Sequence, residues 1–223
     1  MHMEFVAKDE IKAIVDHALT LQLKQRGFKK RAFTWHKGIG DISQVVNVQL
    51  GRFNDRHESN FTLNVGCYHE QFHIERGLVP VTSTLKEYDC DVRVRIGELM
   101  GDRDNWWTVA YNKNNEKVRD GFKYNVDQHV WGWLDDHREF TDFYDFFIAN
   151  NRFFDAAVAT YILGLDNIDN LLDSALKTAN RHFRPTVERW LGTKERIRRI
   201  TMRCTRSPTC AWFWNGRLLV RVR

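Results

Sequence analysis

The chain has 223 residues, of which 43% are hydrophobic and 13% aromatic, enough for a sizeable core and too many for a disordered chain. Lys and Arg outnumber Asp and Glu by 34 to 29. The excess is uneven: residues 177–223 hold thirteen basic and two acidic residues, a net charge of +11, whereas the remainder holds 21 basic and 27 acidic residues, a net charge of −6.

The sequence also argues against membrane, secreted and disulfide-rich proteins. No window approaches the roughly 18 uncharged apolar residues of a membrane-spanning helix, and the first ten residues lack the pattern of a secretory signal. The four cysteines show neither a C-x-x-C pair nor regular spacing, which argues against a disulfide framework. We therefore expect a cytoplasmic protein without a membrane partner.

The N-terminal part predicts one helix followed by a meander of strands. Residues 9–25 carry apolar side chains at helical spacing, and Gly27 stands where a left-handed helix cap belongs. Apolar and polar residues then alternate in several runs, as in half-buried strands. The expected strands are residues 31–37, 42–50, 61–67 and 90–96, with a turn at residues 38–41.

The C-terminal third predicts helices and a terminal hairpin. The helical segments expected there are residues 140–163, 166–180 and 185–200. Residues 211–220 are apolar on both sides of Asn215-Gly216, a dipeptide that strongly favours a hairpin turn. We therefore predict a single α+β domain over residues 1–223: an antiparallel sheet of about four or five strands packed on an N-terminal helix, followed by a helical C-terminal third.

One face of the predicted sheet is polar. If the apolar sides of the strands pack against the first helix, alternation leaves amide and cationic side chains on the opposite side. That side carries Asn47, Gln49, Thr62, Asn64, Arg93 and Arg95. Such a surface suggests recognition of a partner, so we interpret Asn47, Gln49, Asn64, Arg93 and Arg95 as candidate binding residues.

Several ordered blocks of sequence resemble a known family. The blocks are residues 27–30, 40–49 with Arg52-Phe53, 61–66, 90–99 and Trp106-Trp107. They resemble the bacterial family catalogued as domain of unknown function 4304, over about residues 8–135, and leave residues 136–223 as a helical and basic C-terminal extension. The resemblance implies a bacterial, cytosolic helix-plus-sheet domain with its motif residues on the polar face. It implies no activity, cofactor or catalytic residue.

Residues 69–73 match the H-E-x-x-H pattern of zinc peptidases. On a helix, His69 and His73 would share one face and bind zinc, while Glu70 would act as general base toward a zinc-bound water. Glu87 or Glu98 would supply a third ligand. The segment directly follows a predicted strand and is bracketed by glycines, which disfavours a long helix. A zinc peptidase is therefore an alternative, and the leading interpretation requires no cofactor.

Two further alternatives involve phosphate chemistry. Arg196, Arg199 and Arg203 would fall near one stripe of a helix, with Trp190 and Trp212 nearby in the chain, as suits nucleic-acid binding. Asp89, Asp91 and Glu98 beside two strand arginines could instead serve a metal-dependent nuclease. The leading interpretation remains a non-catalytic macromolecular interaction module with an unidentified protein partner.

Overall fold

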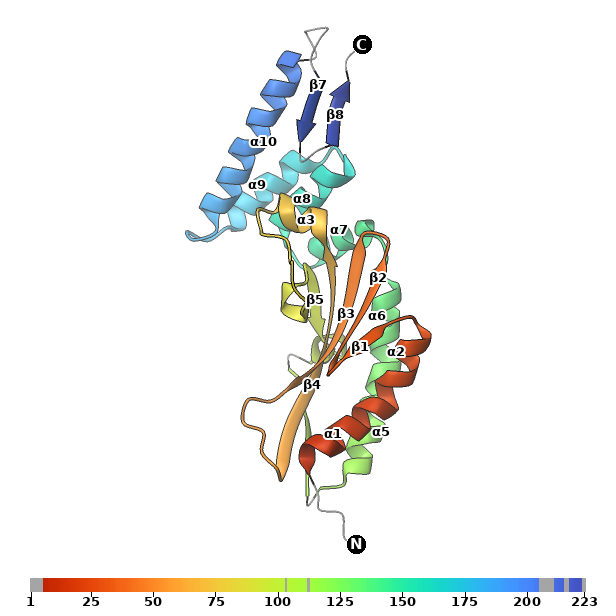
Figure 1. The fold of residues 1–223 in the computed structure, drawn as a ribbon. Helices are drawn as coiled ribbons and strands as arrows, with labels where there is room; N and C mark the ends of the chain where they lie inside the picture. Colours follow the sequence, from red (N-terminus) through yellow and green to blue (C-terminus); the bar gives the residue numbers. More distant parts are fainter. Residues whose placement is uncertain (1–5, 103, 112, 205–210, 215–216, 222–223) are drawn as a thin grey trace.

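A computed structural model describes the backbone of residues 6–102, 104–111, 113–204, 211–214 and 217–221, and side chains up to residue 194 (Figure 1). The chain opens with α1 (Ala7–Val15), which continues through a π-helical turn (Asp16–Thr20) into α2 (Leu21–Gln25). Gly27 follows with φ of 87°, the left-handed conformation that ends many helices. The predicted first helix and its cap are confirmed.

Six strands form one antiparallel sheet in the order β1-β2-β3-β4-β5, with β6 also paired to β4. The strands are β1 (Lys29–Arg31), β2 (Thr34–Ile39), β3 (Ile42–Leu50), β4 (Glu58–His69), β5 (Val92–Arg95) and β6 (Trp107–Ala110). One edge of β4 pairs with β3, and its other edge pairs with β6 near its start and with β5 near its end. The predicted meander and the fold class are confirmed.

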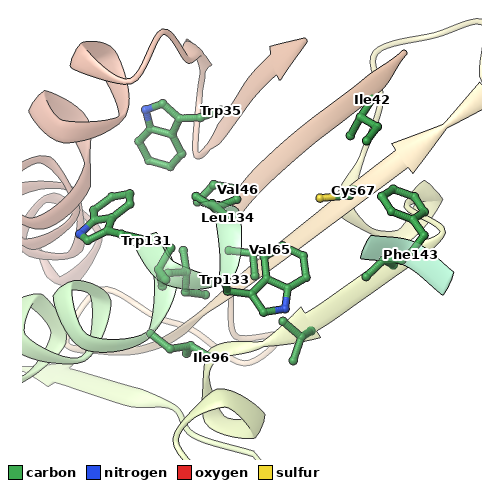
Figure 2. Close-up of a cluster of buried hydrophobic side chains, with 14 of the residues drawn as sticks. Trp35, Ile42, Val46, Val65, Cys67, Ile96, Trp131, Trp133, Leu134 and Phe143 are labelled. Atoms are coloured by element: carbon green, nitrogen blue, oxygen red, sulfur yellow. The ribbon is translucent and has the colours of Figure 1, made fainter. Parts of the chain in front are cut away.

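One face of the sheet is covered by helices (Figure 1). α5 (Asn115–Asn125) runs through a second π-helical turn (Val126–Val130) into α6 (Trp131–Asp135), beside the N-terminal helix. Figure 2 shows apolar side chains of the central strands meeting those of α6 in the core. The side chain of Gln44, which also faces the helices, donates to the carbonyl oxygens of Leu134 and His137 at 2.6 and 3.0 Å, so the sheet satisfies the end of α6.

Three short elements join these layers: α3 (Glu70–Glu75) directly after β4, a 3₁₀ turn (Glu87–Asp89) before β5, and α4 (Ile96–Leu99) directly after β5. The segment between α3 and β5 crosses the sheet on the side opposite the helices. The Tyr68 hydroxyl accepts a hydrogen bond from the Val81 backbone amide at 3.3 Å, and Val45 beneath the segment is completely buried. This side, which we call the outer face, is therefore covered at one end.

The C-terminal third is helical. It contains α7 (Phe140–Ala149), α8 (Phe153–Leu163), α9 (Ile168–Thr178) and α10 (Arg184–Cys204), followed by β7 (Ala211–Trp214) paired with β8 (Arg217–Arg221). The single helix expected at residues 140–163 is two helices, because Asn151 adopts φ of 55°, which a continuous helix does not allow. The strands of the predicted hairpin are confirmed, and its Asn215-Gly216 turn lies outside the described residues. In the described part of the chain, no helix has the length and apolar character needed to cross a bilayer.

Candidate functional site

The strand register brings most of the predicted binding residues together on the outer face. One row across the sheet consists of Thr34, Asn47, Asn64 and Arg95, each paired with the next. Gln49 pairs with Thr62 beside this row. The predicted face is therefore correct for these residues, because antiparallel pairing keeps side chains of matching parity on one side.

Three of the predicted residues form one hydrogen-bonded network. The Asn64 side-chain amide donates to Gln49 Oε1 at 3.0 Å. Arg95 donates through Nε to Asn64 Oδ1 and through a terminal nitrogen to Gln49 Oε1, both at 3.3 Å. Asn64 is almost fully buried, so its two partners satisfy an amide that would otherwise be desolvated without compensation.

Asp104 and Trp106 complete the surroundings of Arg95. Arg95 forms an ion pair with Asp104, and its guanidinium lies 5.3 Å from the centre of the Trp106 ring. The Trp106 indole donates to Asp104 at 2.9 Å. The hydrogen bond from Arg95, followed by that from Trp106, holds the pKa of Asp104 below its ordinary value. Together with the hydrogen bonds to the amides, these contacts fix the position of the Arg95 guanidinium.

Asn47 and Arg93 are held less tightly than the Arg95 network. Asn47 donates to the Thr34 hydroxyl at 2.9 Å. Arg93, which pairs with Gly66 in β5, is exposed and forms no hydrogen bond or ion pair with any side chain that the structure describes. Its guanidinium is therefore available to an external acceptor, such as a carboxylate or a peptide carbonyl.

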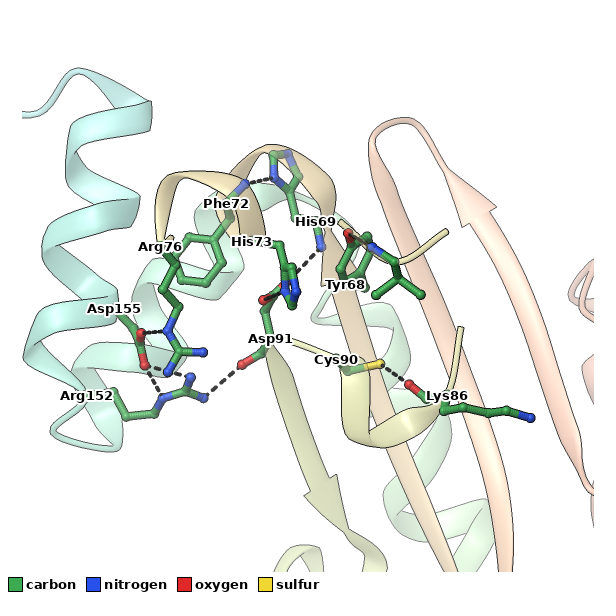
Figure 3. Close-up of polar contacts among 11 residues, drawn as sticks. Tyr68, His69, Phe72, His73, Arg76, Lys86, Cys90, Asp91, Arg152 and Asp155 are labelled. Carbon is green, nitrogen blue, oxygen red and sulfur yellow. Dashed lines mark hydrogen bonds and ion pairs between the residues drawn. The ribbon is translucent and has the colours of Figure 1, made fainter. Parts of the chain in front are cut away.

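The H-E-x-x-H motif lies where the sheet meets the C-terminal helices (Figure 3). His69 is the last residue of β4 and precedes α3 in an extended conformation, with φ of −130°. Its Nδ1 accepts from the Phe72 backbone amide at 3.1 Å, and its ring lies 4.3 Å from that of Phe140. Burial lowers the pKa of His69, which favours the neutral ring that this cap requires. His69 therefore acts as an N-cap and is not part of the helix.

The second histidine of the motif, His73, contacts the carboxylate of Asp91. His73 Nδ1 lies 2.9 Å from one carboxylate oxygen of Asp91, whose other oxygen accepts from the His69 backbone amide at 3.0 Å. Asp91 is nearly inaccessible to solvent, and burial raises its pKa in spite of these contacts. Glu70 is exposed at the start of α3. Among the described residues, no three His, Cys, Asp or Glu side chains are grouped so as to hold a metal ion.

Comparison with known families explains the ordered sequence blocks. The model of the family described as domain of unknown function (DUF4304) matches residues 19–136, more than half of the chain. The chain belongs to the DUF4304 family. The predicted family is thereby confirmed, and all five candidate binding residues lie within the matched region. Searches of curated proteins and of solved structures gave no match.

The C-terminal helices, which follow the DUF4304 region in the chain, are attached to that region mainly through α3. Arg76 and Arg152 both pair with Asp155, each at 2.7 Å, and Arg152 also donates to the Asp91 carbonyl at 2.9 Å (Figure 3). At the end of α3, the Trp190 indole donates to the Glu75 carbonyl at 2.7 Å. The H-E-x-x-H segment thus serves as a junction, a role that its local pattern did not indicate.

The remaining predicted site residues either belong to separate local turns or have side chains outside the described residues. Asp89 accepts from the Lys86 backbone amide at 2.8 Å, and Glu98 accepts from that of Arg95 at 3.2 Å, so these two carboxylates cap local turns. Glu87 opens the 3₁₀ turn that Asp89 ends. In the basic tail, α10 runs to Cys204 and includes the positions of Arg196, Arg199 and Arg203, whose side chains lie outside the described residues.

Proposed function

We propose that this member of the DUF4304 family is a non-catalytic interaction module. Its open outer face would bind an unidentified protein partner. The observation that carries the proposal is the network of Gln49, Asn64 and Arg95. Beside it on β5 lies the guanidinium of Arg93, which has no side-chain partner among the described residues.

The chemistry of the open face suits a partner that presents hydrogen-bond acceptors. Among the described residues, neither the guanidinium of Arg93 nor the side-chain nitrogen of Gln49 has a hydrogen-bond partner. Arg and Trp are enriched at the centres of protein interfaces, and Arg95 stacked on Trp106 supplies both. Because Asn64 and Asp104 already hold Arg95, binding would cost little additional ordering of that side chain.

The same network also stabilises the sheet by itself, so Arg95 does not distinguish a binding surface from a structural one. Arg93 does, because its side chain contributes no hydrogen bond or ion pair to the part of the fold that the structure describes. Asn47, with a single side-chain hydrogen bond to Thr34, is the second informative position.

The proposal is tested by capturing partners on the immobilised protein and then measuring the affinity of an identified partner by calorimetry. We expect Arg93→Ala and Asn47→Ala to weaken binding about tenfold each while the melting temperature stays within the range of ordinary surface variants. Lys117→Ala, which removes an exposed cation from α5 on the helix-covered side, is the matched control.

Unchanged affinity in both outer-face variants would contradict the proposal. Loss of folding in Asn47→Ala would instead assign that residue a structural role and leave Arg93 to decide. The zinc-peptidase, nuclease and nucleic-acid hypotheses stay predictions. The cytoplasmic location and bacterial origin likewise stay predictions.

A further inference from the structure

One row of paired residues crosses the outer face from edge to edge. It consists of Arg31 on β1, Thr34 on β2, Asn47 on β3, Asn64 on β4 and Arg95 on β5, each paired with the next. We call these residues the arginine row. Cross-strand partners project to the same side of a sheet, so both arginines lie on the outer face. Neighbouring strands are about 4.8 Å apart, which separates the backbones at the two ends by about 19 Å.

The neighbouring row has cations at both ends as well but is covered in the middle. Lys29 on β1 and Arg93 on β5 end this second row. Its central residue, Val45, is completely buried under the segment that joins α3 to β5. Asn47, at the centre of the arginine row, is only partly buried. The arginine row is therefore the accessible path between the two edges.

Each edge of the outer face thus carries two cations, whereas the residues between the two arginines of the row are neutral. Lys29, Arg31 and Arg93 are exposed, and none of them forms an ion pair within the described part of the chain. The two acidic residues of the turn before β5, Glu87 and Asp89, form no ion pair with them either. Ion pairs therefore do not cancel the positive potential of this face, although residues 1–176 have a net charge of −6.

The two arginines of the row are held in position by the protein itself. Arg31 donates to the Thr84 hydroxyl at 2.5 Å. Arg95 is held by Asn64 and Asp104. Because both guanidinium groups are already ordered, a ligand that contacts both of them would cost little additional side-chain entropy. Their separation also favours ligands whose acceptors are far apart.

We propose that the arginine row binds an extended acidic segment of the protein partner, which crosses the strands and places a carboxylate at each edge of the sheet. Carboxylates accept paired hydrogen bonds from guanidinium groups. An extended chain of about six residues spans nearly the distance between the two edges, at about 3.3 Å per residue. The inference rests on the proposed protein-binding function and specifies the chemistry of the partner.

The neutral centre of the row favours a peptide over a nucleic acid. Asn47 and Gln49 carry amide groups, which can pair with the N–H and C=O groups of a peptide backbone. The side-chain nitrogen of Gln49 has no partner among the described residues. A nucleic-acid strand would instead place a phosphate charge at every nucleotide along a stretch that offers no cation.

The test is an NMR titration of the full chain with two capped hexapeptides of identical composition, EQQQQE and QQEEQQ. Saturable shifts of the Arg31, Asn47 and Arg93 signals are expected with EQQQQE. Its affinity should be about tenfold higher than that of QQEEQQ, because only separated carboxylates reach both edges. Equal affinities, or no saturable shifts with either peptide, would overturn the inference. Tighter binding of a single-stranded oligothymidylate than of EQQQQE would overturn it in favour of a nucleic acid.

The double variant Arg31→Gln, Arg93→Gln should bind EQQQQE about tenfold more weakly, because a charged hydrogen-bond donor is lost at each edge. The matched control is Lys8→Gln, Lys117→Gln, which makes the same change in net charge at exposed positions of α1 and α5. Equal weakening in the control would reduce the effect to general electrostatics and refute the site.

The proposed protein-binding function is judged separately, from the affinity of the identified partner. If that partner depends on Arg93 and Asn47 while EQQQQE does not bind, the outer face still binds a protein and only the acidic segment is refuted. If partner binding depends on neither residue, both proposals fail.

Discussion

Arg95 is held on more sides than any of the other predicted binding residues. It contacts amides on β3 and β4, a carboxylate in the loop before β6, and the ring of Trp106. The neighbouring Arg93 has the same charge and lies on the same strand, but its side chain has no comparable partner among the described residues. Substitutions of the two arginines can therefore separate a role in stability from the proposed role in binding.

We expect Arg95→Ala to lower the free energy of unfolding by about 1–3 kcal/mol, because it leaves the buried Asn64 oxygen without its donor. Urea unfolding measures this change. The pKa of Asp104 should rise toward its ordinary value in the variant, since Arg95 is the main cause of its depression. Arg93→Ala is the control, with an expected change of at most about 0.5 kcal/mol. Equal effects of the two substitutions would contradict this distinction.

Alternation within strands was sufficient to place Asn47, Asn64 and Arg95 on one face, because side-chain parity is a local property of extended backbone. It was not sufficient to find Asp104 and Trp106 as partners of Arg95. They come from a loop whose path depends on tertiary packing and has no periodic signal. The H-E-x-x-H pattern predicted two histidines on one helix face, but the pattern does not indicate whether its first residue belongs to a strand or to a helix. His69 ends a strand and caps the helix that follows.

At the level of elements, length alone did not decide what could be predicted: β4 was expected only over residues 61–67, and the helical stretch of residues 115–135 was not among the expected elements. β3 was predicted with its observed bounds, since its nine residues alternate and a glycine-containing turn precedes them. β1 consists of three exposed cationic residues, and β6 has only four residues, so neither carries enough alternation to be recognised. The break between α7 and α8 depends on the conformation of Asn151, which helical periodicity does not report.

Gly66 shows how one element constrains another. A Cβ at this position of β4 would lie 2.8 Å from the Cys90 side chain and 3.1 Å from the Val92 carbonyl oxygen. We expect Gly66→Ala to destabilise the protein by about 1–3 kcal/mol through overpacking. Gly121→Ala, in α5 where a Cβ meets nothing within 4 Å, should instead stabilise it by about 0.5–1 kcal/mol. Thermal unfolding of the pair provides the measurement. A neutral Gly66→Ala would show that the crossing segment shifts freely over the sheet.

For the whole molecule, the buried carboxylate of Asp91 lies between the sheet and the C-terminal helices. Its side chain binds the start and the middle of α3, while its carbonyl accepts from Arg152 before α8. The expectation of one domain over residues 1–223 stays a prediction. These contacts nevertheless cross the end of the DUF4304 region at residue 136, so loss of the Asp91 contacts should affect both parts.

Asp91 also predicts a pH dependence of stability. Because burial raises its pKa above the ordinary 3.8, the folded state binds this proton more tightly than the unfolded state. Its contribution to stability is therefore fully present below pH 3.8 and declines as the pH rises through the folded pKa. We expect the free energy of unfolding of the wild type, relative to Asp91→Asn, to increase as the pH is lowered from 7 toward 4. Urea titrations at several pH values test this, and a constant difference would rule out Asp91 as the source.

The twelve residues of β4 serve three structures at once: the helix-covered core, the Arg95 network and, through His69, the cap of α3. A single inserted residue in this strand would turn Asn64 toward the helices and Val65 toward the outer face, because side chains alternate with a period of two. All three structures would then fail together. Among members of the family, we therefore expect β4 to keep its residue count, while the loops at residues 51–57 and 78–86 can change in length.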